Sequence, residues 1–306
     1  MKKNGWKGFC KKLYKYRVFL LMLAPAVIYT LIFSYYPMTG IVMAFKKYSY
    51  AGGIWGSPWN GFDNFKFFFK SGQVTRNTVL YNLAFIAINT TMQIAVAVLL
   101  TEIRNKHYCK ITQSLMFLPY FISWVIVGVM AFNIFSSDYG FLNRLIETFG
   151  GTPIKFYTTP KAWPFILVFF NVWKGIGYGS VMYLAAIMGI DTSIYEAARI
   201  DGANVFQRIF KVTIPMIMPT TIILLLLSVG GIFKGNFDMF YNLVGSNGLL
   251  YNYTDVIDTL TFRALISSND FGMSAAVGLY QSVLCFITVV IVNKLVGLYD
   301  KDYTLF

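Results

Sequence analysis

Apolar residues gather in six long stretches along the chain, separated by segments that hold most of the charges. A bilayer has a hydrocarbon core about 30 Å thick, which a helix of about 20 mostly apolar residues can cross. The pattern therefore predicts an all-α integral membrane protein with six transmembrane helices, at residues 18–44, 79–101, 112–135, 163–189, 213–233 and 273–297.

The first stretch follows a lysine-rich start, as the apolar part of a secretory signal peptide does. It runs from Val18 to about Ala44, which is longer than such a segment, and no small-residue cleavage site follows it. We therefore expect it to be kept as a span. The second, fourth and fifth stretches hold polar residues, glycines or prolines, which are tolerated only where neighbouring helices or a wet cavity satisfy the backbone.

Composition and charge agree with a membrane protein. The chain is 57% hydrophobic and 13% charged, which is too apolar for a soluble domain. The net charge of +13 indicates topology rather than nucleic-acid binding, because cytoplasmic loops carry excess lysine and arginine. Residues 1–17 hold seven Lys or Arg and no acid. Both termini and the loops 102–111 and 190–212 are therefore expected in the cytoplasm, and the loops 45–78, 136–162 and 234–272 outside.

The charge rule is not clean, because the first external loop also carries five basic residues. The density of charge in the N-terminal tail decides the orientation. We expect one membrane domain at 18–297, with a basic tail at 1–17 and a short cytoplasmic tail at 298–306.

The chain offers no catalytic or metal-binding motif. Cys10, Cys109 and Cys285 are scattered and odd in number, and the single histidine, His107, lies in a basic loop. No G-x-x-x-x-G-K-[ST] sequence is present to hold the phosphates of ATP. We expect a non-catalytic subunit that binds no cofactor or metal itself.

The segment SIYEAARIDGANVFQRIFKVTIP, residues 193–215, stands between the fourth and fifth stretches. Ser193 with Glu196 three residues later predicts a capping box and a helix to about Asp201. Gly202 loosens it, a second turn follows over 203–211, and Pro215 opens the fifth span. By itself this pattern fits equally an amphipathic helix lying on the membrane surface.

The spacing Glu196-Ala197-Ala198, then Gly202, then Val212-Thr213-Ile214-Pro215 resembles the cytoplasmic EAA motif of importer permeases of the ATP-binding cassette superfamily. In that family the short helix docks in a groove of the ATPase and transmits its motion to the spans. The resemblance implies a type I importer permease fold with a coupling helix at about 193–211, and an ATPase-coupling role for Tyr195, Glu196, Ala197, Ala198, Asp201, Gly202, Ala203 and Pro215.

Other blocks are similar to the polysaccharide or complex-oligosaccharide permeases of the maltose-type uptake family, over essentially the whole chain. They include YYPMTGIVMAFKKY (35–48), FLPYFISWVIVGV (117–129) and NVWKGIGYGSVMYLAAI (171–187). The resemblance implies a bacterial cytoplasmic membrane complex. Its partners would be a second permease, two ATPase copies that carry ATP and Mg, and an extracellular solute-binding lipoprotein.

A sugar pathway needs amides for hydroxyl groups and aromatic rings for the apolar sugar faces. Polar and aromatic residues of the second, fourth and sixth stretches are the candidates: Asn89, Gln93, Asn171, Trp173, Lys174, Tyr178, Tyr280 and Gln281. The alternative for the amides is hydrogen bonding between helices. Gly175-x-x-x-Gly179 more often marks a tight helix crossing than a binding site, and Lys174 equally suits snorkelling to an interface.

Three other functions remain open at this stage. The first is an importer permease of the same superfamily for a non-sugar solute, such as a peptide or polyamine. The second is a stand-alone secondary transporter or channel, which commonly shows internal inverted repeats that are not clear here. The third is an extracellular glycan enzyme, for which no suitable carboxylate pair is present.

Overall fold

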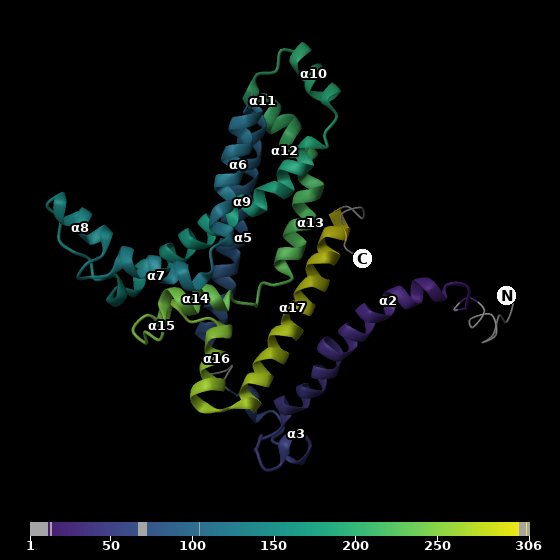
Figure 1. Ribbon diagram of the computed structural model, residues 1–306, viewed down its shortest axis with the longest axis vertical. Helices are drawn as coiled ribbons and strands as arrows, with labels where there is room; N and C mark the ends of the chain where they lie inside the picture. Colours follow the sequence, from purple (N-terminus) through teal and green to yellow (C-terminus); the bar gives the residue numbers. More distant parts are fainter. Residues whose placement is uncertain (1–11, 13, 67–71, 104, 300–303, 305–306) are drawn as a thin grey trace. The chain divides into compact units, whose positions relative to one another are not determined.

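The computed structural model describes residues 12, 14–66, 72–103, 105–299 and 304, which are mostly helical (Figure 1). The chain divides into two compact units. The first combines Met1–Lys66 with Asn269–Leu279, and the second combines Phe67–Ser268 with Tyr280–Phe306. Helix α17 (Phe271–Tyr299) begins in the first unit and ends in the second.

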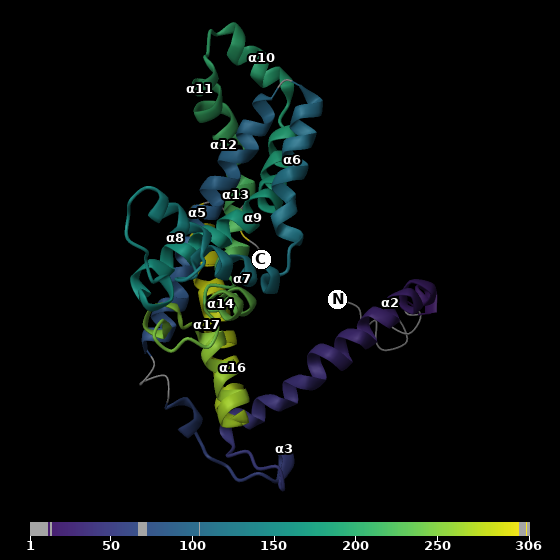
Figure 2. The same cartoon turned by 60° about the vertical axis from the view of Figure 1, so that its left-hand side comes forward.

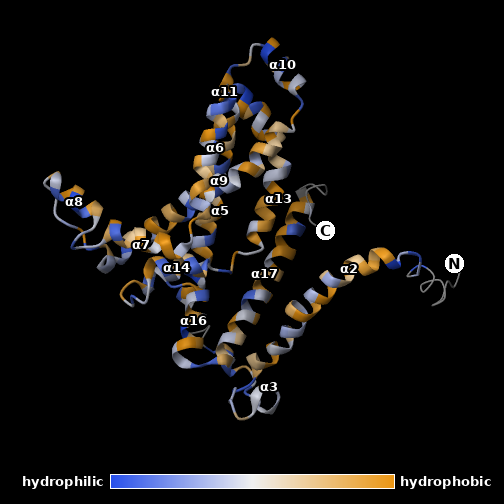
Figure 3. Cartoon of the chain, viewed as in Figure 1, coloured by the Kyte–Doolittle hydropathy of each residue, from blue (hydrophilic) through white to orange (hydrophobic). Residues whose placement is uncertain are grey.

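The first unit begins with a continuous helical run, Arg17–Phe45, made of α2 (Arg17–Thr30), the π-helical η1 (Leu31–Tyr35) and the 3-10 helix η2 (Tyr36–Phe45). Figure 3 shows hydrophobic residues along most of α2. None of the residues in its most apolar stretch is buried by protein. A helix that is apolar all round requires an apolar surrounding, so this run has the character of a lipid-facing or partner-facing span.

A compact loop follows, with the short helices α3 (Gly53–Gly56) and η3 (Asp63–Phe65). Lys46 is buried there, and its Nζ donates to the carbonyls of Ile54 at 3.0 Å and Trp55 at 2.7 Å. Asn64 Nδ2 donates to the carbonyls of Ala44 and Lys46, each at 2.9 Å. Lys46, one of the five basic residues of the predicted first external loop, therefore has a structural role in this loop. Its charge is then weaker evidence against placing the loop outside the cell.

The second unit is built on α5 (Gly72–Glu102) packed against α9 (Trp163–Met188). Helix α6 (Lys106–Phe121) lies on α9 and α13 (Met218–Val229) contacts both α5 and α9 (Figures 1 and 2). A Cβ on Gly177 would lie 1.9 Å from the Met116 carbonyl oxygen of α6. Only glycine permits this close crossing of α6 and α9.

The predicted span at 112–135 differs from the structure. Helix α6 ends at Phe121, and α7 (Trp124–Phe135) leaves it at an angle of 93°. Ile122 and Ser123 are extended between them, and the Ser123 hydroxyl accepts from Ile126 N–H to begin α7. Apolar composition cannot reveal such a break, because apolar residues continue on both sides of it.

The fifth predicted span is also bent, as its prolines suggested. The helical run Val205–Met216, which ends in α12 (Ile214–Met216), meets α13 at 56°, with Ile217 between them. Four helical runs of the described residues are long and apolar enough to cross a membrane, or up to six if each bent pair forms one span. Four of the six predicted spans are therefore continuous helical runs, and the other two correspond to bent helix pairs.

Short helices complete the second unit. They are α8 (Phe141–Thr148), η4 (Phe156–Thr158), η5 (Pro160–Ala162), α10 (Thr192–Ile200), α11 (Val205–Arg208), η6 (Ile209–Thr213), α14 (Phe237–Val244), α15 (Tyr251–Thr254) and α16 (Ile257–Ser268). Helix α14 packs on α7, and together they bury the aromatic core around Trp163 and Phe240.

Candidate functional site

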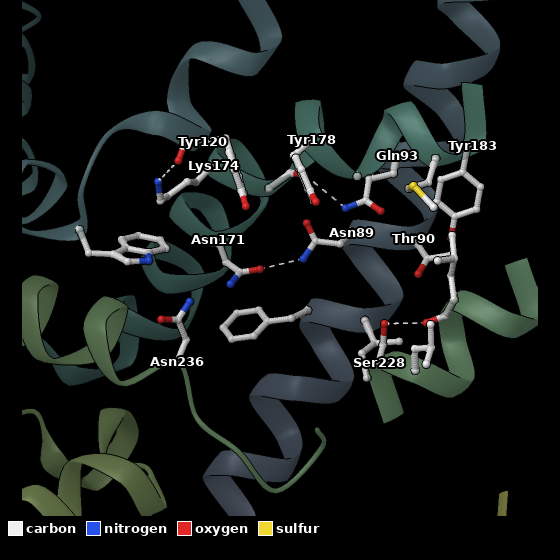
Figure 4. Close-up of a pocket in the computed structure, with 18 residues that line it drawn as sticks. Asn89, Thr90, Gln93, Tyr120, Asn171, Lys174, Tyr178, Tyr183, Ser228 and Asn236 are labelled. Atoms are coloured by element: carbon white, nitrogen blue, oxygen red, sulfur yellow. Dashed lines mark hydrogen bonds between the residues drawn. The ribbon is translucent and has the colours of Figure 1, made fainter. Parts of the chain in front are cut away.

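A cavity of about 590 Å³ lies between α5, α9 and α13, beside the break that separates α6 from α7 (Figure 4). Its polar lining comes from side chains of several different elements: Asn89, Thr90, Gln93, Asn171, Lys174, Ser228 and Asn236. Its aromatic lining is Phe85, Tyr120, Trp124, Tyr178 and Tyr183. The cavity therefore offers ring faces and hydrogen-bonding groups side by side.

Of the described residues that line the cavity, Lys174 alone carries a charge. Its Nζ donates to the carbonyl oxygens of Pro119 at 3.1 Å, Tyr120 at 2.6 Å and Ile122. The last carbonyls of a helix have no intrahelical partner and carry a partial negative charge. The ammonium group therefore caps the broken end of α6.

Aromatic rings complete the surroundings of this cation. Lys174 Nζ lies 5.6 Å from the ring centroid of Tyr120 and 5.4 Å from that of Trp124. A cation at these distances is attracted to a ring face. The sequence expected Lys174 to face either a cavity or an interface. The structure places it at the cavity wall, where it also holds the turn between two half-helices.

The predicted amides join α5 to α9. Asn89 Nδ2 donates to Asn171 Oδ1 at 2.7 Å, and Gln93 Nε2 donates to the Gly175 carbonyl at 3.4 Å (Figure 4). Gly179 leaves the room for Gln93, since a Cβ there would lie 2.1 Å from its Nε2. Asn89 Oδ1 remains a buried acceptor without a hydrogen-bond partner. These amides thus tie the helices together and leave one acceptor open for a donor.

Two tyrosines form a stacked pair at the cavity. The rings of Tyr120 and Tyr178 are 4.3 Å apart and inclined by only 7°, and both side chains are exposed (Figure 4). Tyr178 was predicted for the pathway, whereas Tyr120 and Trp124 were not singled out. Pro119 could have signalled them, because proline in an apolar run often marks a break that exposes neighbouring side chains.

Three predicted pathway residues do not line this cavity. Trp173 packs on the edge of Phe170, with ring centroids 6.1 Å apart, beside the hydrophobic core. Gln281 donates to the Phe233 carbonyl and to Asp258 Oδ2, each at 3.0 Å. Tyr280 is outside the lining as well. The sixth stretch therefore contributes no side chain to the cavity.

The segment that was predicted to couple to an ATPase begins differently from the prediction. Asp191, not Ser193, caps α10, because its carboxylate accepts from the Ser193 backbone N–H at 2.9 Å. The predicted Ser193–Glu196 capping box is wrong. The capping box lies one helix later, where Asn204 and Gln207 exchange hydrogen bonds of 2.8 Å at the start of α11. Asp191 precedes the first helical residue, Thr192, so its carboxylate can accept from an N–H of the first turn, whereas Ser193 already lies inside the helix.

Gly202 ends α10 in a left-handed conformation, with φ of +79°. The Gly202 N–H donates to the Arg199 carbonyl at 3.0 Å, and the Ala203 N–H donates to the Ala198 carbonyl at 2.9 Å. These are the two hydrogen bonds of a Schellman motif, which favours glycine at this position. The expected loosening of the helix is thus a defined turn that reverses the chain toward α11.

Helices α10 and α11 lie at one end of the unit (Figures 1 and 2). Large apolar side chains of α10, α11 and the following η6 are exposed there. Ile200, Phe206 and Phe210 are 86%, 72% and 66% exposed. Tyr195 turns inward, and its hydroxyl lies 3.0 Å from Thr213 Oγ1. Exposed apolar residues next to a fixed turn suit a surface on which a partner docks.

Two aspartates organise the opposite end of the unit. Asp255 forms a two-point ion pair with Arg263, in which Nη1 donates to Oδ1 at 3.0 Å and Nη2 donates to Oδ2 at 2.5 Å. Asp255 Oδ1 also accepts from Thr259 Oγ1. Asp258 Oδ2 accepts from Gly235 N–H at 2.5 Å. Burial raises the pKa of the Asp258 carboxyl above its ordinary range, against the opposing effect of these hydrogen bonds. Sequence reasoning singled out neither residue.

Residues 93–297 match the family model described as the binding-protein-dependent transport system inner membrane component. The chain belongs to this family. The match includes most of the cavity lining and all of α10 and α11. The broken spans and the exposed turn at Gly202 are therefore features of a transport permease.

Relatives extend the similarity over nearly the whole permease. Protein LplB of Bacillus subtilis (strain 168) is 34% identical over 92% of this chain and 89% of its own. The polygalacturonan/rhamnogalacturonan transport system permease protein YteP of the same strain is 32% identical over 98% and 94%. A chain in the crystal structure of a bacterial ABC transporter involved in the import of the acidic polysaccharide alginate matches with a TM-score of 0.85 and 32% identity. That match covers 94% of this chain and 97% of the other.

Proposed function

We propose that this permease forms one half of the translocation pathway of an ATP-driven importer for oligosaccharides or polysaccharide fragments. The observation that carries the proposal is the cavity of about 590 Å³, whose wall combines a tyrosine pair, amide groups with one open acceptor, and one cation. Saccharide recognition requires ring faces for the apolar side of a sugar and hydrogen-bonding groups for its hydroxyls. This chain would supply half of the lining of the complete pathway, and a second permease would supply the other half.

Acidic saccharides are the proposed substrate class. Lys174 contacts only neutral carbonyls and rings, so its charge is not cancelled by a carboxylate in the described part of the chain. A uronate that enters the cavity would meet this uncompensated positive charge. Relatives whose names refer to polygalacturonan and alginate are consistent with this chemistry.

The remaining components are proposed from the family. The permease itself would have no catalytic activity, and ATP and Mg would bind to two copies of a partner ATPase. That ATPase would dock on α10 and α11, where Ile200 and Phe206 are exposed. A second permease and an extracellular solute-binding lipoprotein would complete the complex, as the periplasmic protein does in a solved alginate transporter. Both termini would lie in the cytoplasm of a bacterial cell.

Affinity purification in mild detergent, followed by mass spectrometry, tests the assembly. We expect a second permease, an ATPase and a solute-binding protein to accompany the chain. Uptake of a labelled uronate oligosaccharide and of a neutral maltooligosaccharide is then measured in cells that carry or lack the chain. Loss of uronate uptake without the chain supports the proposal. A chain that purifies alone, or uptake of both sugars that does not depend on it, rejects the proposal.

A further inference from the structure

A second cavity, of about 650 Å³, lies at the end of the unit that carries α10, where α5 and α9 end and α6 begins. Its floor is apolar and comes from the ends of the spans, including Leu100, Leu184 and Ile187. Its rim carries the basic side chains Lys106, Lys110, Arg199 and Arg208. The cavity is thus apolar below and cationic above.

The rim charges are not balanced within the chain. Glu102 and Glu196 are the two acidic residues of the lining, against four basic residues, which leaves two positive charges in excess. In the described part of the chain, ion pairs join only Lys66 to Asp63 and Arg263 to Asp255, so no rim cation forms one. Arg208 Nη1 donates to the Ala203 carbonyl, a neutral group, at 3.5 Å. The excess charge therefore favours an anion.

The two faces of α10 are separate. Thr192, Tyr195, Glu196 and Arg199 line the cavity, with the spacing of one helical face. Ile200 is 86% exposed and does not line it. An occupant of the cavity would contact the inner face of α10 and leave the exposed apolar side chains of the segment for a docking partner.

We propose that this cavity binds the phosphate-bearing headgroup of an anionic phospholipid, between α10 and the start of α6. The inference rests on the proposed function, which places this end of the spans at the cytoplasmic leaflet. Basic pockets at the cytoplasmic ends of spans suit anionic headgroups, and the apolar floor suits the adjoining acyl chain. A soluble phosphate compound shares the chemistry of the headgroup, but it has no acyl chain that could contact the apolar floor of the cavity.

Binding is measured by native mass spectrometry of the purified importer, titrated separately with phosphatidylglycerol and phosphatidylcholine. Each basic side chain near an anionic lipid contributes a factor of about five to affinity. The double variant Lys106→Gln/Lys110→Gln should therefore bind phosphatidylglycerol about thirty-fold more weakly. Lys106→Arg/Lys110→Arg should keep the binding. The matched control Lys15→Gln/Lys211→Gln removes the same charge outside the cavity lining.

Equal loss in the control, or no loss in the lining variant, overturns the proposal. Glycerol phosphate that displaces phosphatidylglycerol at similar concentration overturns the lipid assignment in favour of a soluble anion. Hydrogen exchange of the wild-type protein provides a test that does not depend on whether a variant folds. Amides of residues 192–200 should be protected in phosphatidylglycerol bilayers relative to phosphatidylcholine, and equal protection contradicts the site. None of these measurements requires a transported sugar, so their failure is distinct from failure of the sugar-importer assignment.

Discussion

The ammonium nitrogen of Lys174 in α9 lies 2.6 Å from the Tyr120 carbonyl oxygen at the end of α6. This contact joins a cavity wall to the break in a membrane-spanning segment, where α6 and α7 meet at 93°. One side chain thus performs two tasks, because it supplies the only charge among the described residues of the lining and satisfies carbonyls that a continuous helix would have paired. The two tasks can be separated by experiment.

Lys174→Met should weaken the α6–α7 junction and remove the charge of the cavity. Hydrogen bonds that involve a charged group contribute about 1.5–3 kcal/mol each, so we expect the free energy of unfolding to fall by about 2 kcal/mol. Thermal unfolding in detergent measures this part. Uptake of an acidic oligosaccharide should fall more than uptake of a neutral one. An equal fall for both would leave Lys174 with the structural task only.

Tyr178 should act through its ring face. Tyr178→Phe keeps the stack on Tyr120, 4.3 Å away, and should leave sugar uptake near the wild-type rate. Tyr178→Leu removes the ring, and aromatic pairs contribute about 0.5–1.5 kcal/mol beyond their buried area. We therefore expect the apparent substrate affinity to fall between about two-fold and twelve-fold. Equal uptake by the Phe and Leu variants would exclude a stacking role.

Gly202→Ala should disturb coupling to the ATPase. A Cβ at φ of +79° costs about 1–2 kcal/mol, because L-residues disfavour the left-handed region. The turn between α10 and α11 would then relax, and we expect less ATPase to copurify with the permease. Gly189→Ala is the matched control, since Gly189 also follows a helix but has φ of −80°. Equal copurification of the two variants would show that the turn geometry is not needed for docking.

Asp258 should make stability depend on pH. Because burial raises its pKa, the folded protein holds this proton more tightly than the unfolded chain does. The resulting stabilisation is complete at acidic pH and is lost as the pH rises through the raised pKa. Asp258→Asn keeps an acceptor for Gly235 N–H but does not titrate. The melting temperature of wild type relative to the variant should therefore fall from acidic to neutral pH, and parallel melting curves would contradict this.

The sequence by itself determined the class of the protein and the position of a short helix, α10, between the fourth and fifth apolar stretches. Apolar runs long enough for a bilayer located α9 and α17 to within two residues at each end, because exclusion of charge is a property of the run alone. Helix α5 begins seven residues before the predicted span, at Gly72. The spacing from Glu196 to Pro215 indicated the family that the matched residues 93–297 confirm. The amides Asn89, Gln93 and Asn171 of α5 and α9 were also singled out from the sequence, either for a pathway or for hydrogen bonds between helices.

Only the tertiary structure decided what these residues contact. The break after Phe121 depends on carbonyls satisfied by Lys174, which lies 53 positions further along the chain, and no local pattern reports such a partner. Asp191 is the N-cap of α10, because the backbone brings its carboxylate to the Ser193 N–H. Trp173 and Gln281 do not line the cavity, because Trp173 packs against the hydrophobic core and Gln281 bonds to the Phe233 carbonyl. Which face of a helix meets a cavity depends on packing between segments that are distant in the sequence.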